Sequence, residues 1–493
     1  MKNTMEQCRL RSSLLWLGIL LIAGCSTTLA PDLETLFRPE QLDDPARAYM
    51  QPPVVIIPGL LGSRLVSTES GQEAWPGGLF DIAFSRYEAI ELPVDGATRV
   101  PDPLPSALEA RGVTETALGR DFYGRIIDTL VQFGGYRRAK LGEGKPESGE
   151  RRVYVFDYDW RQDNVTTVRK LKVFLDRVRQ DYGQEALKFD IVAHSMGGLI
   201  ARFFLRFGDE DVLLDNRLKV TWAGAPYLNK IILLGTPNLG SLSSVEGFVR
   251  GQKVGFARIP EEMVATLPST YQVSPHRIVR WLVKENGERV DMDPFSARTW
   301  RGYQLNIFAP EVKARVIERR GEDYYRMLTQ RFREYGERAR RFSWSLTVCP
   351  DYDEKMQRCA TGKVEPPLRY VVFRGSCSET PARAILQEKE GRHFIRFRPS
   401  EVSGAADPER LEALMFDPGD GTVTKPSLLA RDALNPLTPR HEYSYFPLGY
   451  AFLLCEDHST LTGNPHFQNN LLDVLLTRAR PWELHLDHAN RKR

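Results

Sequence analysis

The sequence predicts a doubly wound α/β fold with a mostly parallel sheet and an inserted cap. Short apolar runs alternate along the chain with longer segments of helical spacing. The apolar runs are continuous rather than alternating, which is typical of parallel strands covered on both faces. The expected strands are residues 54–57, 153–156, 189–193, 231–234 and 370–373, and the expected helices are residues 122–133, 165–182 and 199–207.

The length and charge of the chain limit the classes of function. Its 493 residues suit one large α/β domain with insertions, or two ordinary domains. The formal charge is +3, and the first 24 residues contribute part of it through Lys2, Arg9 and Arg11 against Glu6. The remainder is therefore about neutral and gives no reason to expect a nucleic-acid partner.

The N-terminus reads as an export signal. A basic start is followed by the apolar run at 14–21, which is short for a membrane-spanning helix. The run ends in Ile-Ala-Gly-Cys at 22–25, which resembles the lipobox of bacterial lipoproteins. This resemblance implies a signal peptide over 1–24, with Cys25 lipidated as the first residue of the mature chain. The alternative is an ordinary secretory signal with a chance cysteine.

The residues after the lipobox suggest where the protein resides. Ser26 is not Asp, which in families resembling enterobacterial lipoproteins favours sorting to the outer membrane. Residues 25–51 have little periodicity and read as a tether. We therefore expect a lipid-anchored protein of the bacterial cell envelope, facing the periplasm.

Four cysteines remain in the predicted mature chain besides Cys25. An even number in an oxidising compartment is compatible with two disulfides. Cys349 and Cys359 are close in sequence, whereas Cys377 and Cys455 each follow an apolar run. These spacings favour two pairs, but three connectivities are possible, and free buried thiols are the alternative.

The remaining segments divide into a core and an insertion. Residues 52–244 and 346–480 are expected to form the two parts of the core, and residues 481–493 a polar tail. Residues 245–345 read as a cap over the carboxyl edge of the sheet. The aromatic residues within the basic helical pattern at 312–342 are expected to form a packed helix face rather than a cofactor site.

The segment 189–199 predicts a nucleophile. An apolar strand runs into His-Ser-Met-Gly-Gly, and a helical pattern follows. A small residue two positions before a serine and a glycine two positions after it form a nucleophile elbow, which indicates the α/β-hydrolase fold with Ser195 as nucleophile. Ala193 stands where glycine is more common, and its methyl group is the smallest departure. A chance Ser-x-Gly is the alternative.

Two backbone amides are candidates for an oxyanion hole. In this fold one donor is the residue after the nucleophile, here Met196. The other comes from the loop after an early strand, and Leu60 in the Pro-Gly-Leu-Leu-Gly-Ser segment at 58–63 fits that place. By itself the segment would indicate an ordinary glycine-rich loop, but the presence of the elbow favours the oxyanion hole.

An acid and a base must follow the elbow in that order. Asp420 lies on a glycine-flanked turn, and His458 follows the apolar stretch at 450–454. Asp417 is a rival acid, whereas Asp457 is too close to the histidine to orient it. The rival bases are His441 and His466.

A set of motifs resembles the lecithin:cholesterol acyltransferase family, with its lysosomal phospholipase and phospholipid:diacylglycerol acyltransferase relatives. The motifs are PGLLGS at 58–63, YDWR at 158–161, AHSMGG at 193–198, LGTPNLGS at 234–241, LPSTYQ at 267–272 and GDGTV at 419–423. The chain departs from the pattern at Ala193 and in its bacterial lipoprotein start.

The resemblance assigns residues to roles. It implies Ser195, Asp420 and His458 as the triad, and Leu60 and Met196 as the oxyanion donors. It also places the segment with Trp75 in a lid region, so that Trp75 is a candidate substrate contact. Trp160 and Arg161 are either further substrate contacts or part of a structural ion pair behind the site.

These observations predict a serine hydrolase that acts on acyl esters of lipids through an acyl-enzyme. Its partners would be a lipid ester, the membrane that holds its anchor and, if the acyl group is transferred, an alcohol acceptor. No metal or cofactor is expected. The alternatives are a non-catalytic envelope lipoprotein that uses the fold for binding, and an esterase for small esters or polyesters.

The lipobox generates the first testable prediction. Cys25→Ser removes the sulfur to which the predicted anchor is attached, so the protein should leave the membrane fraction or keep its signal peptide. Fractionation and the mass of the mature N-terminus measure both outcomes. An unchanged distribution and an unchanged mass would show that the lipobox interpretation is wrong.

Overall fold

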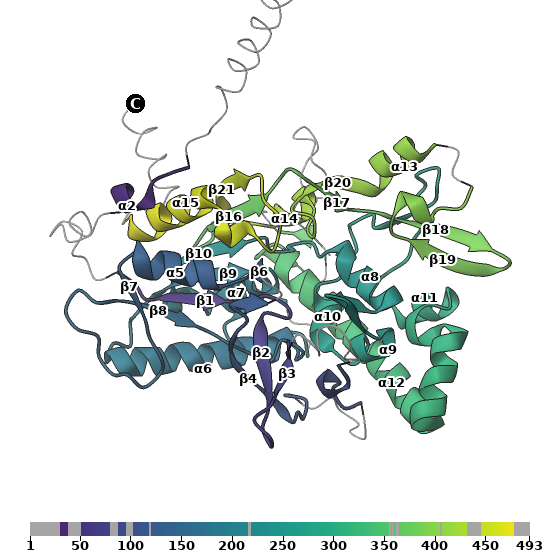
Figure 1. Ribbon diagram of the computed structural model, residues 1–493, viewed down its shortest axis with the longest axis horizontal. Helices are drawn as coiled ribbons and strands as arrows, with labels where there is room; N and C mark the ends of the chain where they lie inside the picture. Colours follow the sequence, from purple (N-terminus) through teal and green to yellow (C-terminus); the bar gives the residue numbers. More distant parts are fainter. Residues whose placement is uncertain are drawn as a thin grey trace, which may run out of the picture.

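A computed structural model describes residues 30–37, 51–78, 87–94, 102–117, 120–214, 218–353, 356, 358–360, 364–404, 407–430 and 445–477 (Figure 1). The predicted signal peptide, Cys25, His441 and the predicted polar tail lie outside these residues. Of the predicted tether, residues 30–37 and Gln51 are described, with one short helix, α2 (Leu33–Leu36). No helix within the described ranges is both long and apolar enough to span a membrane.

The core is a seven-stranded sheet in which every neighbouring pair is parallel. Its order is β21-β16-β10-β9-β1-β8-β7. All five strands expected from the apolar runs are present, so the predicted α/β-hydrolase fold class is confirmed. The strands are β1 (Val54–Ile57), β7 (Tyr136–Arg138), β8 (Arg151–Val155), β9 (Phe189–His194), β10 (Leu228–Leu234), β16 (Tyr370–Gly375) and β21 (Leu448–Leu454).

Helices cover both faces of this sheet (Figure 1). Val54 and Ile56 of β1 face one apolar cluster with α5 (Gly124–Gln132) and α15 (Pro465–Leu476). Val55 and Ile57 face the other cluster, which includes α6 (Asn164–Tyr182) and α7 (Met196–Phe207). Burial on both sides explains why the strand sequences are apolar throughout rather than alternating.

The cap follows β10 and occupies the right of Figure 1. Its longest element is α12 (Pro310–Thr347), whose helical geometry is interrupted at Gly321, where φ is 85°. Leu328 and Phe332 of α12 are buried within the large apolar cluster, as predicted for a packed helix face. The other cap elements are α8 (Leu242–Arg250), β11 (Gln252–Val254), β12 (Ala257–Ile259), α9 (Glu261–Val264), α10 (Pro268–Gln272), β13 (Leu282–Val283) and α11 (Ala297–Gly302).

A second insertion separates β16 from β21, within the segment that the sequence assigns to the core. Its strand β18 pairs in parallel with β13 of the cap, so the two insertions share a small sheet. Local sequence patterns give no sign of this pairing because β13 has only two residues. The insertion contains β17 (Ser378–Pro381), β18 (Ala384–Lys389), β19 (Arg392–Arg396), α13 (Pro408–Met415), β20 (Phe416–Gly419) and α14 (Lys425–Leu428).

The segment after β1 forms a separate antiparallel sheet of three strands. Its order is β3-β2-β4, with β2 at Ser63–Ser67, β3 at Glu73–Trp75 and β4 at Leu108–Val113. This sheet carries Trp75 to the edge of the core, beside the loop that follows β1. The remaining short strands are β5 (Thr116–Ala117), β6 (Arg120–Asp121), β14 (Tyr352–Asp353) and β15 (Arg358–Cys359).

Both favoured cysteine pairs are disulfides in the structure. Cys349–Cys359 closes a loop after α12, and Cys377–Cys455 joins the segments that follow β16 and β21. The described residues contain one group of three side chains close enough to hold a metal ion, Cys349, Asp351 and Cys359. Its two sulfurs form the disulfide, so they do not supply thiolate ligands.

Candidate active site

Ser195 occupies a sharp turn between β9 and α7. Its backbone has φ 53° and ψ −125°, a strained combination for a residue with a side chain. The turn exists because the adjacent glycines admit close backbone contact. A Cβ on Gly197 would lie 2.5 Å from the Pro58 carbonyl oxygen, and one on Gly198 would lie 2.0 Å from Thr236 Oγ1. The predicted elbow is therefore present.

Three side chains form a continuous hydrogen-bonded chain at the elbow. His458 Nε2 is 3.0 Å from Ser195 Oγ, and His458 Nδ1 is 2.8 Å from Asp420 Oδ2. The other carboxylate oxygen of Asp420 accepts from the amides of Thr422 and Val423, at 3.0 and 2.7 Å. The carboxylate is thereby fixed with one oxygen toward the imidazole. This is the arrangement in which a histidine can take the proton of a serine hydroxyl.

The rival acids have other partners. Asp417 forms an ion pair with Arg383, with the closer contact at 2.6 Å. Asp457 accepts from the Ser378 hydroxyl at 2.5 Å. Of the rival bases, His466 is exposed in the first turn of α15, whereas His441 lies outside the described residues. Among the described candidates, Asp420 and His458 are the pair that reaches Ser195.

The surroundings shift the pKa values of both His458 and Asp420. Burial by itself would lower the pKa of His458, but the Asp420 carboxylate outweighs burial and raises that pKa above 6.5. Burial would raise the pKa of Asp420, but His458 and the two backbone amides outweigh it and lower that pKa. Near neutral pH, Asp420 is therefore the charged acceptor that orients the His458 ring.

Leu60 and Met196 present the predicted oxyanion donors. Met196 is the first residue of α7, where amide N–H groups have no partner within the helix. The amide of Leu60 has no hydrogen-bond acceptor among the described residues. A Cβ on the neighbouring Gly59 would lie 3.3 Å from Ser195 Oγ, so the loop passes directly beside the hydroxyl. Both amides can therefore donate to an oxygen near Ser195.

A cavity of about 740 Å³ opens above Ser195 and His458. Apolar side chains supply much of its lining, and Lys253 is the cation among the described lining residues. Trp75 lines the cavity too, and its indole N–H donates to the Leu61 carbonyl at 2.8 Å. The apolar side chains of the lining are Leu60, Leu61, Trp75, Pro76, Phe122, Val254 and Phe256.

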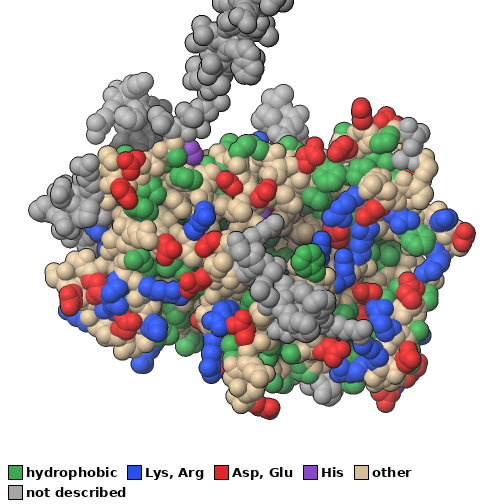
Figure 2. All heavy atoms as spheres, in the orientation of Figure 1, with side chains coloured by type: hydrophobic (Ala, Val, Ile, Leu, Met, Phe, Trp, Pro, Cys, Tyr) green, Lys and Arg blue, Asp and Glu red, His purple; other side chains and the backbone are tan. Residues whose placement is uncertain are grey.

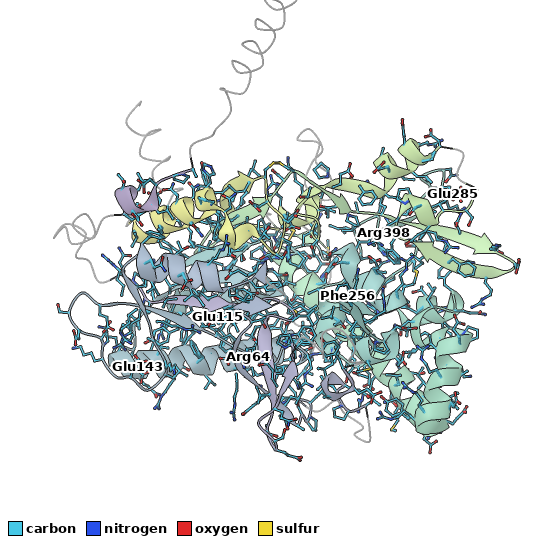
Figure 3. All side chains as sticks on the ribbon, in the orientation of Figure 1. Arg64, Glu115, Glu143, Phe256, Glu285 and Arg398 are labelled. Carbon is cyan, nitrogen blue, oxygen red and sulfur yellow. A yellow bond between two sulfur atoms is a disulfide. The ribbon has the colours of Figure 1, made fainter. Side chains whose placement is uncertain are left out.

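Phe256 was not anticipated from the sequence. It lies on the turn between β11 and β12, is 91% exposed and still lines the cavity mouth. Figure 3 places it near the middle of the molecule, and Figure 2 shows Lys and Arg side chains gathered on the cap side of the same face. The signal in the sequence was the glycine of Val254-Gly255-Phe256, which is typical of a hairpin turn.

The structure corrects the suggestion that Trp160 and Arg161 contact substrate. Both side chains are buried outside the cavity lining. Trp160 donates its indole N–H to the Ser63 carbonyl, and Arg161 forms an ion pair with Asp159 at 2.8 Å. The Arg161 guanidinium also donates to the Ile90 carbonyl and to the Ser106 hydroxyl, so it joins segments of the fold, and the structural alternative is the one that holds.

Comparisons with known proteins agree with this architecture. Residues 121–311 match the family described as lecithin:cholesterol acyltransferase. A human protein, lysosomal phospholipase A and acyltransferase, is 24% identical over 282 residues, which are 48% of this chain and 62% of that protein. The chain thus spans less than two thirds of the length of this relative.

Two solved structures match most of the chain at low identity and with low TM-scores. The Tle4-Tli4 complex includes a chain with 12% identity and a TM-score of 0.48, and the match covers 86% of this chain and 98% of that one. The mature lipase BlEst2 of Bacillus licheniformis has 13% identity and a TM-score of 0.29, with 87% and 93% covered.

The site generates a prediction about acyl-ester cleavage. Ser195→Ala and His458→Ala should each lower kcat/KM for an acyl ester at least about a thousandfold without unfolding the chain, because each removes a reacting group. Ser70→Ala, which removes an exposed hydroxyl from the turn between β2 and β3, is the matched control and should retain activity. Covalent labelling by a fluorophosphonate that persists in Ser195→Ala would place the nucleophile elsewhere.

The raised pKa of His458 predicts how the activity of the site depends on pH. A base must be unprotonated to accept a proton, so activity should fall as the pH is lowered through that pKa. Because the pKa is raised, the midpoint of the acid limb of kcat/KM should lie above 6.5. A midpoint below 6.5 would contradict the assigned coupling to Asp420.

Proposed function

We propose that the chain, which is similar to the lecithin:cholesterol acyltransferase family over residues 121–311, is a serine hydrolase of lipid acyl esters. The observation that carries the proposal is the chain of hydrogen bonds from Ser195 through His458 to Asp420, at the floor of a largely apolar cavity. A protein that used the fold only for binding would have no need of this arrangement.

The reaction follows from the positions of the atoms. Ser195 Oγ attacks the ester carbonyl carbon while His458 Nε2 takes its proton, and Asp420 stabilises the imidazolium that forms. The amides of Leu60 and Met196 donate to the oxyanion. The tetrahedral intermediate then expels the alcohol, which receives the proton from His458. Water or another alcohol, deprotonated by His458, releases the acyl group and restores Ser195.

The cavity favours a lipid as the source of the ester. Apolar side chains at the mouth and wall can cover an acyl chain, whose transfer from water stabilises the complex by about 0.8 kcal/mol per buried methylene. Lys253 adds a positive charge to the lining, which suits a phosphate-bearing head group. Both features support a phospholipid over a small soluble ester.

The anchor predicted from the sequence would bring the cavity to its substrate. A protein held at Cys25 in the envelope of a bacterium meets phospholipids at high local concentration. This localisation is part of the proposal and rests on the sequence at 14–25.

The same residues can serve hydrolysis or acyl transfer, so the outcome depends on how well water is excluded. We expect hydrolysis as the main reaction, because the cavity is open to solvent at the Phe256 mouth. Some transfer should occur when an alcohol is supplied.

The test uses a phospholipid with a labelled acyl chain, with and without a long-chain alcohol. Free fatty acid as the main product in both reactions supports hydrolysis. Label that moves almost entirely to the alcohol would make the protein an acyltransferase instead. If folded protein cleaves no acyl ester and no fluorophosphonate labels it, the binding-module alternative is favoured.

A further inference from the structure

A second histidine lies at the elbow and has no part in the reaction above. His194 precedes Ser195, and its ring centroid is 4.8 Å from that of His458. Its Nδ1 is 2.9 Å from the hydroxyl of Tyr123, and its Nε2 is 3.2 Å from the backbone carbonyl oxygen of His458. The ring therefore bridges a tyrosine on one side and the proposed base on the other.

The contacts fix the direction of every hydrogen bond in this bridge. A carbonyl oxygen only accepts, so His194 Nε2 must carry the proton that it donates to His458. His194 Nδ1 is then an acceptor in the neutral ring and receives the hydroxyl proton of Tyr123. The Tyr123 oxygen in turn accepts the amide proton of Gly59 at 2.8 Å. In this arrangement the Tyr123 hydroxyl and both ring nitrogens of His194 each have a hydrogen-bond partner.

The same surroundings keep His194 uncharged. Burial, with a smaller contribution from the neighbouring His458 ring, lowers its pKa to about 3. Burial also raises the pKa of Tyr123, so its hydroxyl keeps the proton that it donates. A neutral His194 places no positive charge beside the imidazolium that forms on His458 during the reaction.

The bridge connects the parts of the site that must hold a fixed geometry. Gly59 adjoins Leu60 in the proposed oxyanion loop, and His194 belongs to the elbow. The backbone of His458 is held at both ends, because its amide donates to the Asp420 carbonyl at 2.8 Å and its carbonyl accepts from His194. Movement of the base relative to the oxyanion donors would strain this chain.

We propose that Tyr123 and His194 are positioning residues. Through the hydrogen-bonded path Gly59–Tyr123–His194–His458, they hold the base and the oxyanion loop in fixed positions relative to each other. The proposal rests on the serine hydrolase mechanism given above. Neither side chain takes part in bond making. Their effect is on the orientation of His458 toward Asp420 and on the place of the Leu60 amide.

The first test is Tyr123→Phe, which removes one oxygen and leaves the ring. Gly59 loses its acceptor and His194 loses the donor that fixes its proton on Nε2. We expect kcat to fall about tenfold to a hundredfold while KM changes little, because a buried hydrogen-bond network loses partners while the Tyr123 ring that lines the cavity is kept. Tyr271→Phe is the matched control, since it removes a buried hydroxyl that donates to the Ala265 carbonyl in the cap. It should leave kcat unchanged.

A pH profile separates positioning from a general loss of stability. Of the ionisable groups that the structure describes, Asp420 hydrogen-bonds to the His458 ring and His194 packs against it, and Asp420 is what raises its pKa. A loosened His458 would couple less well to Asp420, so the acid limb of kcat/KM should shift to lower pH in Tyr123→Phe. The control should keep the wild-type limb.

Two variants of His194 test the contribution of the second side chain in the hydrogen-bonded path. His194→Phe has no donor for the His458 carbonyl, whereas His194→Gln retains an amide N–H. We expect His194→Gln to be at least about tenfold more active than His194→Phe. If His194→Phe does not fold, the pair of tyrosine variants decides the question.

The outcomes distinguish this proposal from the function on which it rests. A wild-type kcat and acid limb in Tyr123→Phe, measured on active wild-type protein, would overturn the positioning role and leave the hydrolase assignment intact. Absence of ester cleavage and of fluorophosphonate labelling in the wild type would overturn both.

Discussion

The close packing around residues 195–198 is the constraint on which the site depends. A Cβ on Gly197 would lie 2.6 Å from the Ile57 carbonyl oxygen at the end of β1, and one on Gly198 would lie 2.0 Å from the Thr236 hydroxyl just after β10. A Cβ on Gly59 would lie 2.7 Å from Ser195 Cβ, so the oxyanion loop and the nucleophile are held in contact from the other side. Larger side chains at these glycines would push the strand ends apart. The strained backbone of Ser195 is maintained by this packing.

The parallel sheet explains why groups far apart in the sequence meet. Ser195 follows β9, Leu60 follows β1 and His458 follows β21, and these strands end at one edge of the sheet. Asp420 lies in the insertion after β16. It directly follows β20, which pairs with β17. Glycines after β10 and at the end of β16 leave room for the acid and the base. A Cβ on Gly235 would lie 2.9 Å from His458 Nδ1, and a Cβ on Gly375 would lie 2.7 Å from Asp420 Cβ.

Much of this arrangement can be predicted from local patterns. Continuous apolar runs locate the strands because burial on both faces leaves no polar positions. The elbow is predictable because strand, turn and helix are contiguous between 189 and 207. The order of acid and base narrows the choice, and the family resemblance then favours Asp420 and His458 over their rivals.

Other features depend on contacts between distant segments and could not be read from the sequence. Tyr123 has no motif of its own, and its place beside His194 follows from the packing of α5 on the sheet. The pairing of β13 with β18 and the place of Phe256 at the cavity are also long-range results. For Trp160 and Arg161, a charged and aromatic motif suggested substrate recognition, but both side chains are buried and bonded to other parts of the fold, which gives them a structural role.

The central claim is that Ser195 carries the acyl group between donor and acceptor. The most direct measurement is peptide mass mapping after brief reaction with a phospholipid of defined acyl chains, stopped by acid to preserve the ester. Our account predicts that the peptide containing Ser195 gains the mass of one acyl group, and that the gain disappears in Ser195→Ala. An acyl group on any other residue, or turnover without an acylated intermediate at any reaction time, would contradict it.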